Sequence, residues 1–344
     1  MSILVEEGGL FTTIQDLGRR GYLHQGVLES GAMDRQSARN ANVAVANDEN
    51  EAVLEMTLIG PVLTFQSTAL ICMTGDGMTP FLDGDPYPVG YPLIVPKGTT
   101  LSFKAKKEGM RTYLAVAGGF NVPNVMDSKS TYIRAGIGGY KGRNLKKGDD
   151  LELGNPNKLV QPVIEKIEKD NQVWRSDWHV NGPIDEANEL NRNVIRAIPG
   201  THFERLNEES KHQLFKTRFT VKNQSDRMGY RLQSQARIEF NDSFSLLSEA
   251  VALGTVQAPP DGQLIILMAD RQTTGGYPRA LQVASVDICK IAQLRPGQSF
   301  TFTEVSLKEA ERLYVEYERA ITIRKHGIRL KWKQCGSEYG ERSR

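Results

Sequence analysis

The amino-acid sequence predicts a mainly β fold of two related domains with a few short helices. Most of the chain consists of short apolar runs, rich in β-branched residues and separated by Gly, Pro or Asp, a pattern typical of barrels and sandwiches. Similar blocks recur in the two halves at one constant offset. The chain has 344 residues, more than one hydrophobic core usually supports, so two domains are expected.

Both halves contain several predicted strands. The first half has VLEMTL, PVLTF, TALICM, TLSFKA and RTYLAVA, and the second has FTVKN, ARIEF, GTVQA, LIILMA and RALQVAS. Glu55-MTLI-Gly60 matches Glu249-AVAL-Gly254, and at the same offset LICM from Leu70 matches LIIL from Leu264. Chance similarity is the alternative, but the match is ungapped. We therefore expect an internal duplication with these blocks on equivalent strands.

Three helices are predicted among the strands. One runs from about residue 34 to 46 with Asp34 as its N-cap, and one covers residues 286–294. A third begins at Ser306, which forms a capping box with Glu309, and continues to about residue 323. The basic sequence after it is expected to be a solvated or frayed terminus.

These elements divide the chain into four expected segments. The first β domain covers residues 1–155, and the second covers 191–305. Between them, residues 156–190 form a polar connection whose Trp174 and Trp178 indicate that it packs against the protein. Residues 306–344 form the C-terminal helix and a basic tail.

Composition and charge exclude several classes of protein. A net charge of +2 argues against a dedicated nucleic-acid binder. No apolar run approaches the ~20 residues that span a bilayer, and no secretory signal is visible at the N-terminus. The three cysteines form no CxxC pair and the five histidines form no HxxxH pair. We therefore expect no metal site, no membrane partner and a cytoplasmic location.

The segment with the most ligand-binding character is the loop at residues 270–278, DRQTTGGYP, between two predicted strands. Arg271 supplies a forked cation for a carboxylate or phosphate, and glycines let backbone N–H groups approach a ligand. A hairpin whose Gly-Gly pair only turns the chain would explain the same composition. The candidate binding residues of this loop are Thr273, Thr274, Gly275, Gly276 and Tyr277.

Other polar residues stand at strand ends. Asp226 and Arg227 are adjacent, so on an extended strand they point to opposite faces, and only one can face a pocket. Gln257 lies just before the turn sequence Pro-Pro-Asp-Gly. Ser30-Gly31 precede the helix that begins near Asp34, and a helix N-terminus suits an anion. A surface ion pair and simple helix capping are the alternatives for the first and last of these features.

Familiar nucleotide and cofactor motifs are missing from the sequence. It contains no Walker-type phosphate loop and no Met-Lys biotin attachment site. GxSxG and HExxH are also absent. We therefore expect ATP or biotin, if either is used, to be bound by a partner or to visit this chain.

Six motifs resemble one known family: GLFTTIQDLGRRGY, SGAMDRQSARNAN, LEMTLIGPVLTF, RTYLAVAGGF, SDRMGYRL and MADRQTTGGYP. This family includes biotin-dependent carboxyltransferases, the C subunit of 5-oxoprolinase (PxpC) and KipA, and the likeness runs from about residue 9 to 310. The resemblance implies two cyclophilin-like β-barrel domains. One departure is Gly200-Thr201-His202, where a Gly-Pro-Gln type of sequence is expected.

The resemblance also implies partners: a smaller cyclophilin-like subunit of the PxpB or KipI type, and a LamB-type subunit of the PxpA type. The main hypothesis is a subunit of an ATP-dependent 5-oxoprolinase complex, which cleaves 5-oxoproline to L-glutamate and whose ATP is used by the complex. A biotin-dependent carboxyltransferase component is one alternative. A non-enzymatic antagonist of a sensor-kinase inhibitor is the other. The chain carries no carrier-lysine motif, which favours the first hypothesis, and we expect no activity from the chain alone.

We expect the ligand pocket in the second domain. Asp226 and Arg271 are assigned catalytic roles, with Asp226 preferred over Asp270 as the base because Asp270 ends an apolar strand and could only pin the loop. The substrate-binding residues are Gln257, Arg227, Thr273, Thr274, Gly275, Gly276 and Tyr277.

Overall fold

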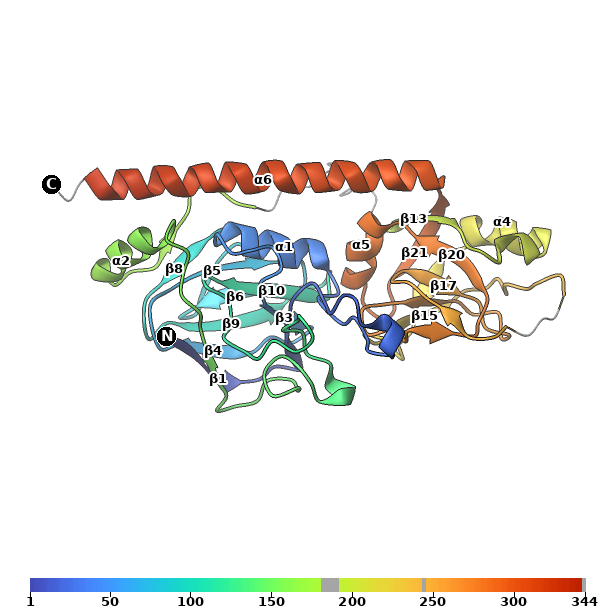
Figure 1. The fold of residues 1–344 in the computed structure, drawn as a ribbon, viewed down its shortest axis with the longest axis horizontal. Coiled ribbons are helices and arrows are strands. Elements are labelled where there is room, and N and C mark those ends of the chain that lie inside the picture. Colours follow the sequence, from blue (N-terminus) through green and yellow to red (C-terminus); the bar gives the residue numbers. More distant parts are fainter. Residues whose placement is uncertain (181–191, 243–245, 342–344) are drawn as a thin grey trace. The chain divides into compact units, whose positions relative to one another are not determined.

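The computed structural model describes residues 1–180, 192–242 and 246–341, and side chains of the last helix as far as residue 337. Its strands and helices form two compact units (Figure 1). The first unit contains Met1–Gly18, Asp34–Gly182 and Arg319–Arg344, and the second contains Arg19–Met33 and Pro183–Glu318. Unlike the expected segments, these units do not follow the chain in order, because residues 19–33 belong to the second unit and the end of the last helix to the first.

The first unit is built from two six-stranded sheets. One has the order β11 (Asp150–Glu152), β1 (Ser2–Glu7), β4 (Val62–Phe65), β9 (Thr100–Ala105), β6 (Met78–Leu82) and β7 (Asp85–Pro86). The other has the order β12 (Trp174–Arg175), β8 (Leu93–Val95), β5 (Ala69–Thr74), β10 (Arg111–Val116), β3 (Val53–Thr57) and β2 (Phe11–Gln15).

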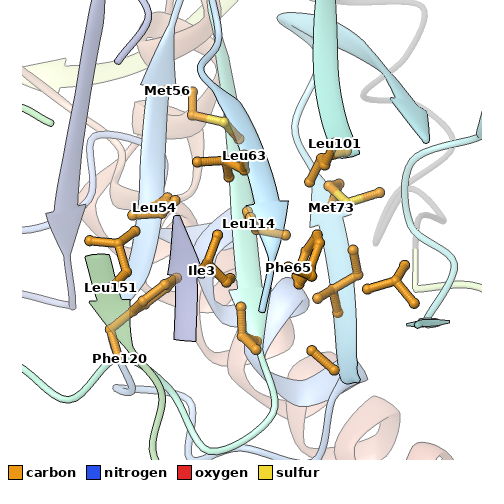
Figure 2. Close-up of a cluster of buried hydrophobic side chains, with 14 of the residues drawn as sticks. Ile3, Leu54, Met56, Leu63, Phe65, Met73, Leu101, Leu114, Phe120 and Leu151 are labelled. Carbon is orange, nitrogen blue, oxygen red and sulfur yellow. The ribbon is translucent and has the colours of Figure 1, made fainter. Parts of the chain in front are cut away.

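Alternate residues of these strands build the core of the first unit. Figure 2 shows Ile3 and Phe65 from one sheet among Leu54 and Leu114 from the other, and all four are fully buried. Because side chains of a strand alternate between its two faces, the residues between them point away from this core. Burial of an aliphatic or aromatic side chain of this size contributes about 1.5–3 kcal/mol, so this cluster stabilises the unit substantially.

The opposite face of the β3–β10 pair is polar and lies under helix α1 (Arg35–Ala44). As expected, Asp34 caps this helix, because its Oδ1 accepts the backbone N–H of Ser37 at 2.9 Å. Tyr113 Oη donates to Glu55 Oε2 at 2.8 Å and accepts the Asp34 backbone N–H at 2.8 Å. Burial and the neighbouring Glu55 carboxylate raise the pKa of Tyr113 well above 10.0, so the phenol stays protonated and can donate.

The second unit contains a closed seven-stranded barrel. Its order is β13 (Val194–Pro199), β20 (Arg279–Val283), β17 (Thr255–Gln257), β18 (Ile265–Leu267), β15 (Gly229–Gln233), β14 (Phe219–Val221) and β21 (Ser299–Glu304). A parallel pairing of β13 with β21 closes it. Phe219, Phe300 and Phe302 pack edge to face or tilted inside the unit, with centroids 5.1–6.3 Å apart.

Short helical segments and a two-stranded ribbon accompany the barrel. α4 covers Glu208–Lys216, and the predicted helix at 286–294 is confirmed as the 3-10 turn η4 (Ser285–Asp287) followed by α5 (Ile288–Gln293). A further 3-10 turn, η3, covers Phe203–Arg205. The ribbon pairs β16 (Glu249–Ala250) with β19 (Thr274–Gly275).

The last helix corrects one expectation. Ser306 Oγ accepts the Glu309 backbone N–H at 3.1 Å, as the capping box predicts, but α6 runs from Leu307 to Glu341 and includes most of the supposed basic tail. Trp332 is fully buried, and its Nε1 donates to the Ala44 carbonyl at 2.9 Å. Ile321, Ile328 and Trp332 of this helix are buried. Because these apolar side chains are packed, the helix continues where composition alone suggests a frayed terminus.

The connection after the first domain contains regular secondary structure in the part that the structure describes. It holds α2 (Gln161–Asp170) and β12, and the prediction that its tryptophans pack is confirmed. The ring centroids of Trp174 and Trp178 lie 6.0 Å and 5.4 Å from that of Trp332. Part of this connection, residues 181–190, lies outside the described residues.

The mainly β prediction is confirmed, and the second unit is a closed barrel. The first of the two matched blocks does not lie on equivalent strands in the two halves, however. Glu55 lies on β3, which pairs with both β2 and β10, whereas Glu249 lies on the two-residue strand β16, which pairs with β19. Similar apolar and turn residues in the two blocks therefore serve different strands.

Candidate functional site

A group of buried polar side chains surrounds the loop between β18 and β20 in the second unit. The loop begins with Asp270, whose carboxylate accepts Nε of Arg227 at 2.9 Å and Nη2 at 3.1 Å. Arg227 Nη2 also donates to the Gly31 carbonyl at 2.7 Å. Asp270 thus pins the loop to the start of β15, as the sequence suggested for a residue that ends an apolar strand.

Arg271 is the centre of this group, and only 4% of the residue is exposed. Its Nη2 donates to Glu29 Oε2 at 2.9 Å, and its Nε donates to the Val251 carbonyl at 3.4 Å. Its Nη1 is buried and has no acceptor among the described residues. A buried guanidinium N–H without an acceptor costs about 1–3 kcal/mol, so it suits a ligand atom.

Gln257 presents a second buried donor. It ends β17 at a bulge, where the register against β20 shifts between Val256 and Gln257. Its Nε2 is buried without an acceptor in the part of the chain that the structure describes. We call Arg271 Nη1 and Gln257 Nε2 the two open donors.

Gly275 leaves room for the Gln257 amide. A Cβ added at Gly275 would lie 2.5 Å from Gln257 Nε2 and 3.4 Å from Cγ1 of Val251. Val251 therefore borders both Gln257 and Arg271, since its carbonyl accepts from Arg271 Nε. From the sequence we predicted that Gly275 lets a ligand approach the backbone. In the structure, the absence of a side chain at Gly275 makes space for the Gln257 amide.

The remaining loop residues lie at the surface or pair with β16. Thr274 and Gly275 pair with Ala250 and Glu249, and Thr274, Gly276 and Tyr277 are exposed. Thr273 is half-buried and its carbonyl accepts the Val251 backbone N–H at 3.2 Å. Thr273, Thr274, Gly276 and Tyr277 are therefore more exposed than Arg271 and Gln257.

Asp226 is placed differently from Arg227, as their adjacency predicts. The residue is exposed, and its Oδ1 accepts the backbone N–H groups of Met228 at 2.8 Å and Gly229 at 3.2 Å. The carboxylate therefore closes the turn that leads into β15. Arg227 is the member of the pair that points inward, toward Asp270.

His202, which departs from the expected sequence, lies beside the same end of β20. The backbone N–H of Arg279 donates to His202 Nδ1 at 3.2 Å. Burial and the positive charge of Arg279 lower the pKa of His202, so the neutral ring that accepts this bond is favoured. Glycine is required at position 200, two residues before His202, since a Cβ there would lie 2.3 Å from the Arg279 carbonyl oxygen.

Glu29 and Val251 are members of the site that the sequence did not predict. Glu29 lies in the stretch GVLESGAMD, where Ser30-Gly31 and the helix cap are the more conspicuous features. Its acidic type and its place directly before the motif SGAMDRQSARNAN were the available signals, but no neighbouring residue indicates that its partner is Arg271.

The family model of the carboxyltransferase domain, subdomain A and B, matches residues 25–304, most of the chain. The chain belongs to this family. The match includes every residue of the group described above, from Glu29 to Gly275.

Carboxyltransferase-family relatives cover nearly the whole chain. It is 37% identical over 311 residues to the C subunit of 5-oxoprolinase from Escherichia coli, a match that spans 90% of this chain and 94% of the relative. The corresponding protein of Haemophilus influenzae is 38% identical over 301 residues, spanning 88% and 90%. Urea amidolyase of Saccharomyces cerevisiae is 32% identical over 324 residues, but this chain spans only 17% of it.

Solved structures agree with this membership. The Kluyveromyces lactis urea amidolyase superposes with a TM-score of 0.82 at 28% identity, over 94% of this chain and 20% of that protein. The protein TTHA0988 superposes with a TM-score of 0.72 at 34% identity, over 88% of this chain and 55% of that one. Both solved chains are therefore considerably longer than the part that this chain matches.

Two further classes of feature are absent from the described residues. Within those ranges, no three His, Cys, Asp or Glu side chains gather as a metal would require. Of the helices that the structure describes, none is both long and apolar enough to cross a bilayer.

Proposed function

We propose that this chain is a subunit of a 5-oxoprolinase complex, which uses ATP to cleave 5-oxoproline to L-glutamate. The observation that carries the proposal is the identity of 37–38% to two proteins named as the C subunit of 5-oxoprolinase, along nearly the full length of each. The match to the family model, residues 25–304, includes the barrel, the loop at 270–278 and Glu29.

The reaction consumes two waters: one adds across the lactam C–N bond, and the other is consumed in the overall conversion of ATP to ADP and phosphate. Opening the lactam requires activation of its carbonyl oxygen, for example by phosphorylation, before water attacks the carbon. The lactam oxygen carries the partial negative charge of the amide, and it becomes an oxyanion when water attacks a carbonyl that is not phosphorylated; fixed N–H donors stabilise the charge in both cases. Arg271 and Gln257 supply two such donors in a buried setting, where a hydrogen bond to developing charge is stronger than in water.

The nucleotide and the other catalytic groups are proposed to come from partners. The sequence has no Walker-type phosphate loop, so ATP would be bound mainly by the smaller cyclophilin-like subunit or the LamB-type subunit. The complex would work in the cytoplasm, where its substrate and ATP are available.

Carboxyl transfer from biotin is the weaker candidate. It is supported by the family model and by the urea amidolyase relatives. Those relatives are 29–32% identical and far longer than this chain, whereas the matches to the 5-oxoprolinase subunits span 88–90% of this chain and 90–94% of each subunit.

Reconstitution tests the proposal. The chain is co-expressed with the two partner subunits from the same source, and 5-oxoproline-dependent ATP hydrolysis and glutamate formation are measured. Turnover should require all three proteins. Absence of glutamate from a stable, intact complex would refute the proposed reaction.

A further inference from the structure

Helix α6 has a packed face and an exposed face where it runs along the first unit, beside α1 (Figure 1). Ile321, Ile328 and Trp332 are buried on the packed face. From the same face, Lys325 Nζ forms an ion pair with Glu49 Oε1 at 2.9 Å. Because an α-helix makes one turn in 3.6 residues, positions 323, 327 and 330 lie on the opposite face.

The opposite face presents apolar side chains to solvent. Ile323 is 73% exposed and Leu330 is 60% exposed. Gly327 lies between them, and a Cβ added there would meet no atom within 4 Å. Glycine destabilises a helix interior relative to alanine, and packing within the described part of the chain gives no reason for it. We call Ile323, Gly327 and Leu330 the exposed seam.

The exposed seam lies in a purely basic stretch of the helix. No acidic residue occurs between Glu318 and Glu338. On one side of the seam stands Lys331, and on the other stand Arg319 and Lys333, all of them exposed. The apolar side chains are therefore flanked by positive charge on both sides.

The spacing of these residues matches the contact positions of a coiled coil. Ile323 and Leu330 are seven residues apart, so both take position d of a heptad, and Gly327 takes position a. Lys331 then falls at position e, and Arg319 and Lys333 fall at position g. Charges at e and g select the partner of a coiled-coil helix, and here the flanking charges are all positive.

We propose that the exposed seam docks an acidic amphipathic helix of a partner protein. Apolar side chains at the a and d positions of that helix would cover the seam, and glutamates at its e and g positions would face the flanking cations. The small residue Gly327 leaves room for a large side chain of the partner. This surface lies outside residues 25–304, which match the family model, and it is independent of the proposed reaction.

Other occupants match the surface less well. A second copy of the same stretch would bring like charges together at e and g. A bilayer suits a helix with a broad apolar face, whereas the exposed seam is a narrow stripe. Nucleic acid would place phosphates against the two aliphatic side chains at the centre of the cations, where no donor meets them.

The test measures binding of synthetic peptides to the full chain by fluorescence anisotropy. The first peptide consists of three EIAALEK repeats, which carry Ile and Leu at a and d and Glu at e and g. The second consists of three EAAAAEK repeats, which keep the charges and the helix propensity but lack the apolar seam. The first peptide should bind about tenfold more tightly than the second, or better.

Variants of the chain test both parts of the surface. I323S/L330S should weaken binding of the first peptide by about tenfold. K331E/K333E should weaken it similarly, and this variant should bind a peptide of three KIAALKE repeats more tightly than the unmodified chain does. L10S/I59S is the matched control, because these side chains are 54% and 59% exposed elsewhere on the first unit. It should leave all affinities unchanged, and melting curves verify that each variant is folded.

Several results would overturn the proposal. One is failure of the unmodified chain to bind the first peptide, or equal affinity for the first two peptides. Another is an affinity that I323S/L330S leaves unchanged, since charge attraction alone would then explain the binding. A dimer of the full chain that I323S/L330S dissociates in sedimentation would instead assign the exposed seam to a second copy. Binding to phosphatidylglycerol vesicles without binding to the first peptide would assign it to a lipid surface.

Discussion

Arg271 and Glu29 form a buried ion pair at 2.9 Å although 242 positions separate them in the sequence. The pair brings the segment at residues 19–33 to the loop at 270–278 within one compact unit. It leaves Nη1 of the guanidinium buried and without an acceptor among the described residues.

Arg271→Ala in the reconstituted complex should reduce turnover about 10²-fold while the subunits stay associated, because one donor to the developing oxyanion is lost. Steady-state glutamate formation and size-exclusion chromatography measure the two properties. Arg205→Ala is the control, because Arg205 pairs with Asp242 on the surface of the same unit. Dissociation of the complex by the Arg271 substitution would instead assign this loop to an interface between subunits.

Asp226→Ala should lower stability by about 0.5–2 kcal/mol and leave the turnover of the folded complex close to normal, because the carboxylate caps a turn. Urea unfolding and initial rates are the measurements. A large loss of turnover without a loss of stability would restore Asp226 to the catalytic role that the sequence suggested.

Trp332→Ala should destabilise the first unit by about 3–5 kcal/mol, since it removes a fully buried indole that joins α6 to Trp174 and Trp178. All three tryptophans of the chain belong to this cluster, so intrinsic fluorescence reports on it directly. Leu330→Ala on the same helix, where Leu330 is 60% exposed, should have little effect. Equal effects of the two substitutions would contradict the packing of α6.

Tyr113→Phe should cost about 1–3 kcal/mol, because it leaves the buried Glu55 carboxylate without the phenol's hydrogen bond. Chemical unfolding at neutral pH measures the loss. Tyr314→Phe, at a position that is 47% exposed, serves as the control and should be nearly neutral.

Acid should loosen the attachment of α6 through Glu49. Burial alone would raise the pKa of Glu49, but hydrogen bonds from Lys325 and Arg39 outweigh it and lower the pKa below 4.5. A carboxyl whose pKa is lower in the folded state stabilises the protein above the unfolded pKa, and that contribution is lost as pH falls through the folded pKa. Glu49→Gln should therefore reduce stability at pH 7 more than at pH 3. The same loss at both pH values would exclude this linkage.

Much of the fold follows from local sequence. The alternation around Leu54 and Met56 predicts a strand with one face in the core, and the Asp34 and Ser306 caps mark helix starts that the structure confirms. The polar, glycine-rich composition of DRQTTGGYP also points to the loop that carries Arg271. These features depend on neighbours a few residues apart, so the order of residues along the chain encodes them.

Other features were decided only by the tertiary structure. The sequence could not show that Glu29 compensates Arg271, that Asp226 turns outward, or that Trp332 anchors a helix through the basic tail. Each depends on which distant segments the closed barrel and the sheets bring together, and propensity and periodicity carry no record of that. The sequence by itself therefore determined the strands, the caps and the chemical types at the site. The packing of distant segments determined which of those groups are paired and which have no partner among the described residues.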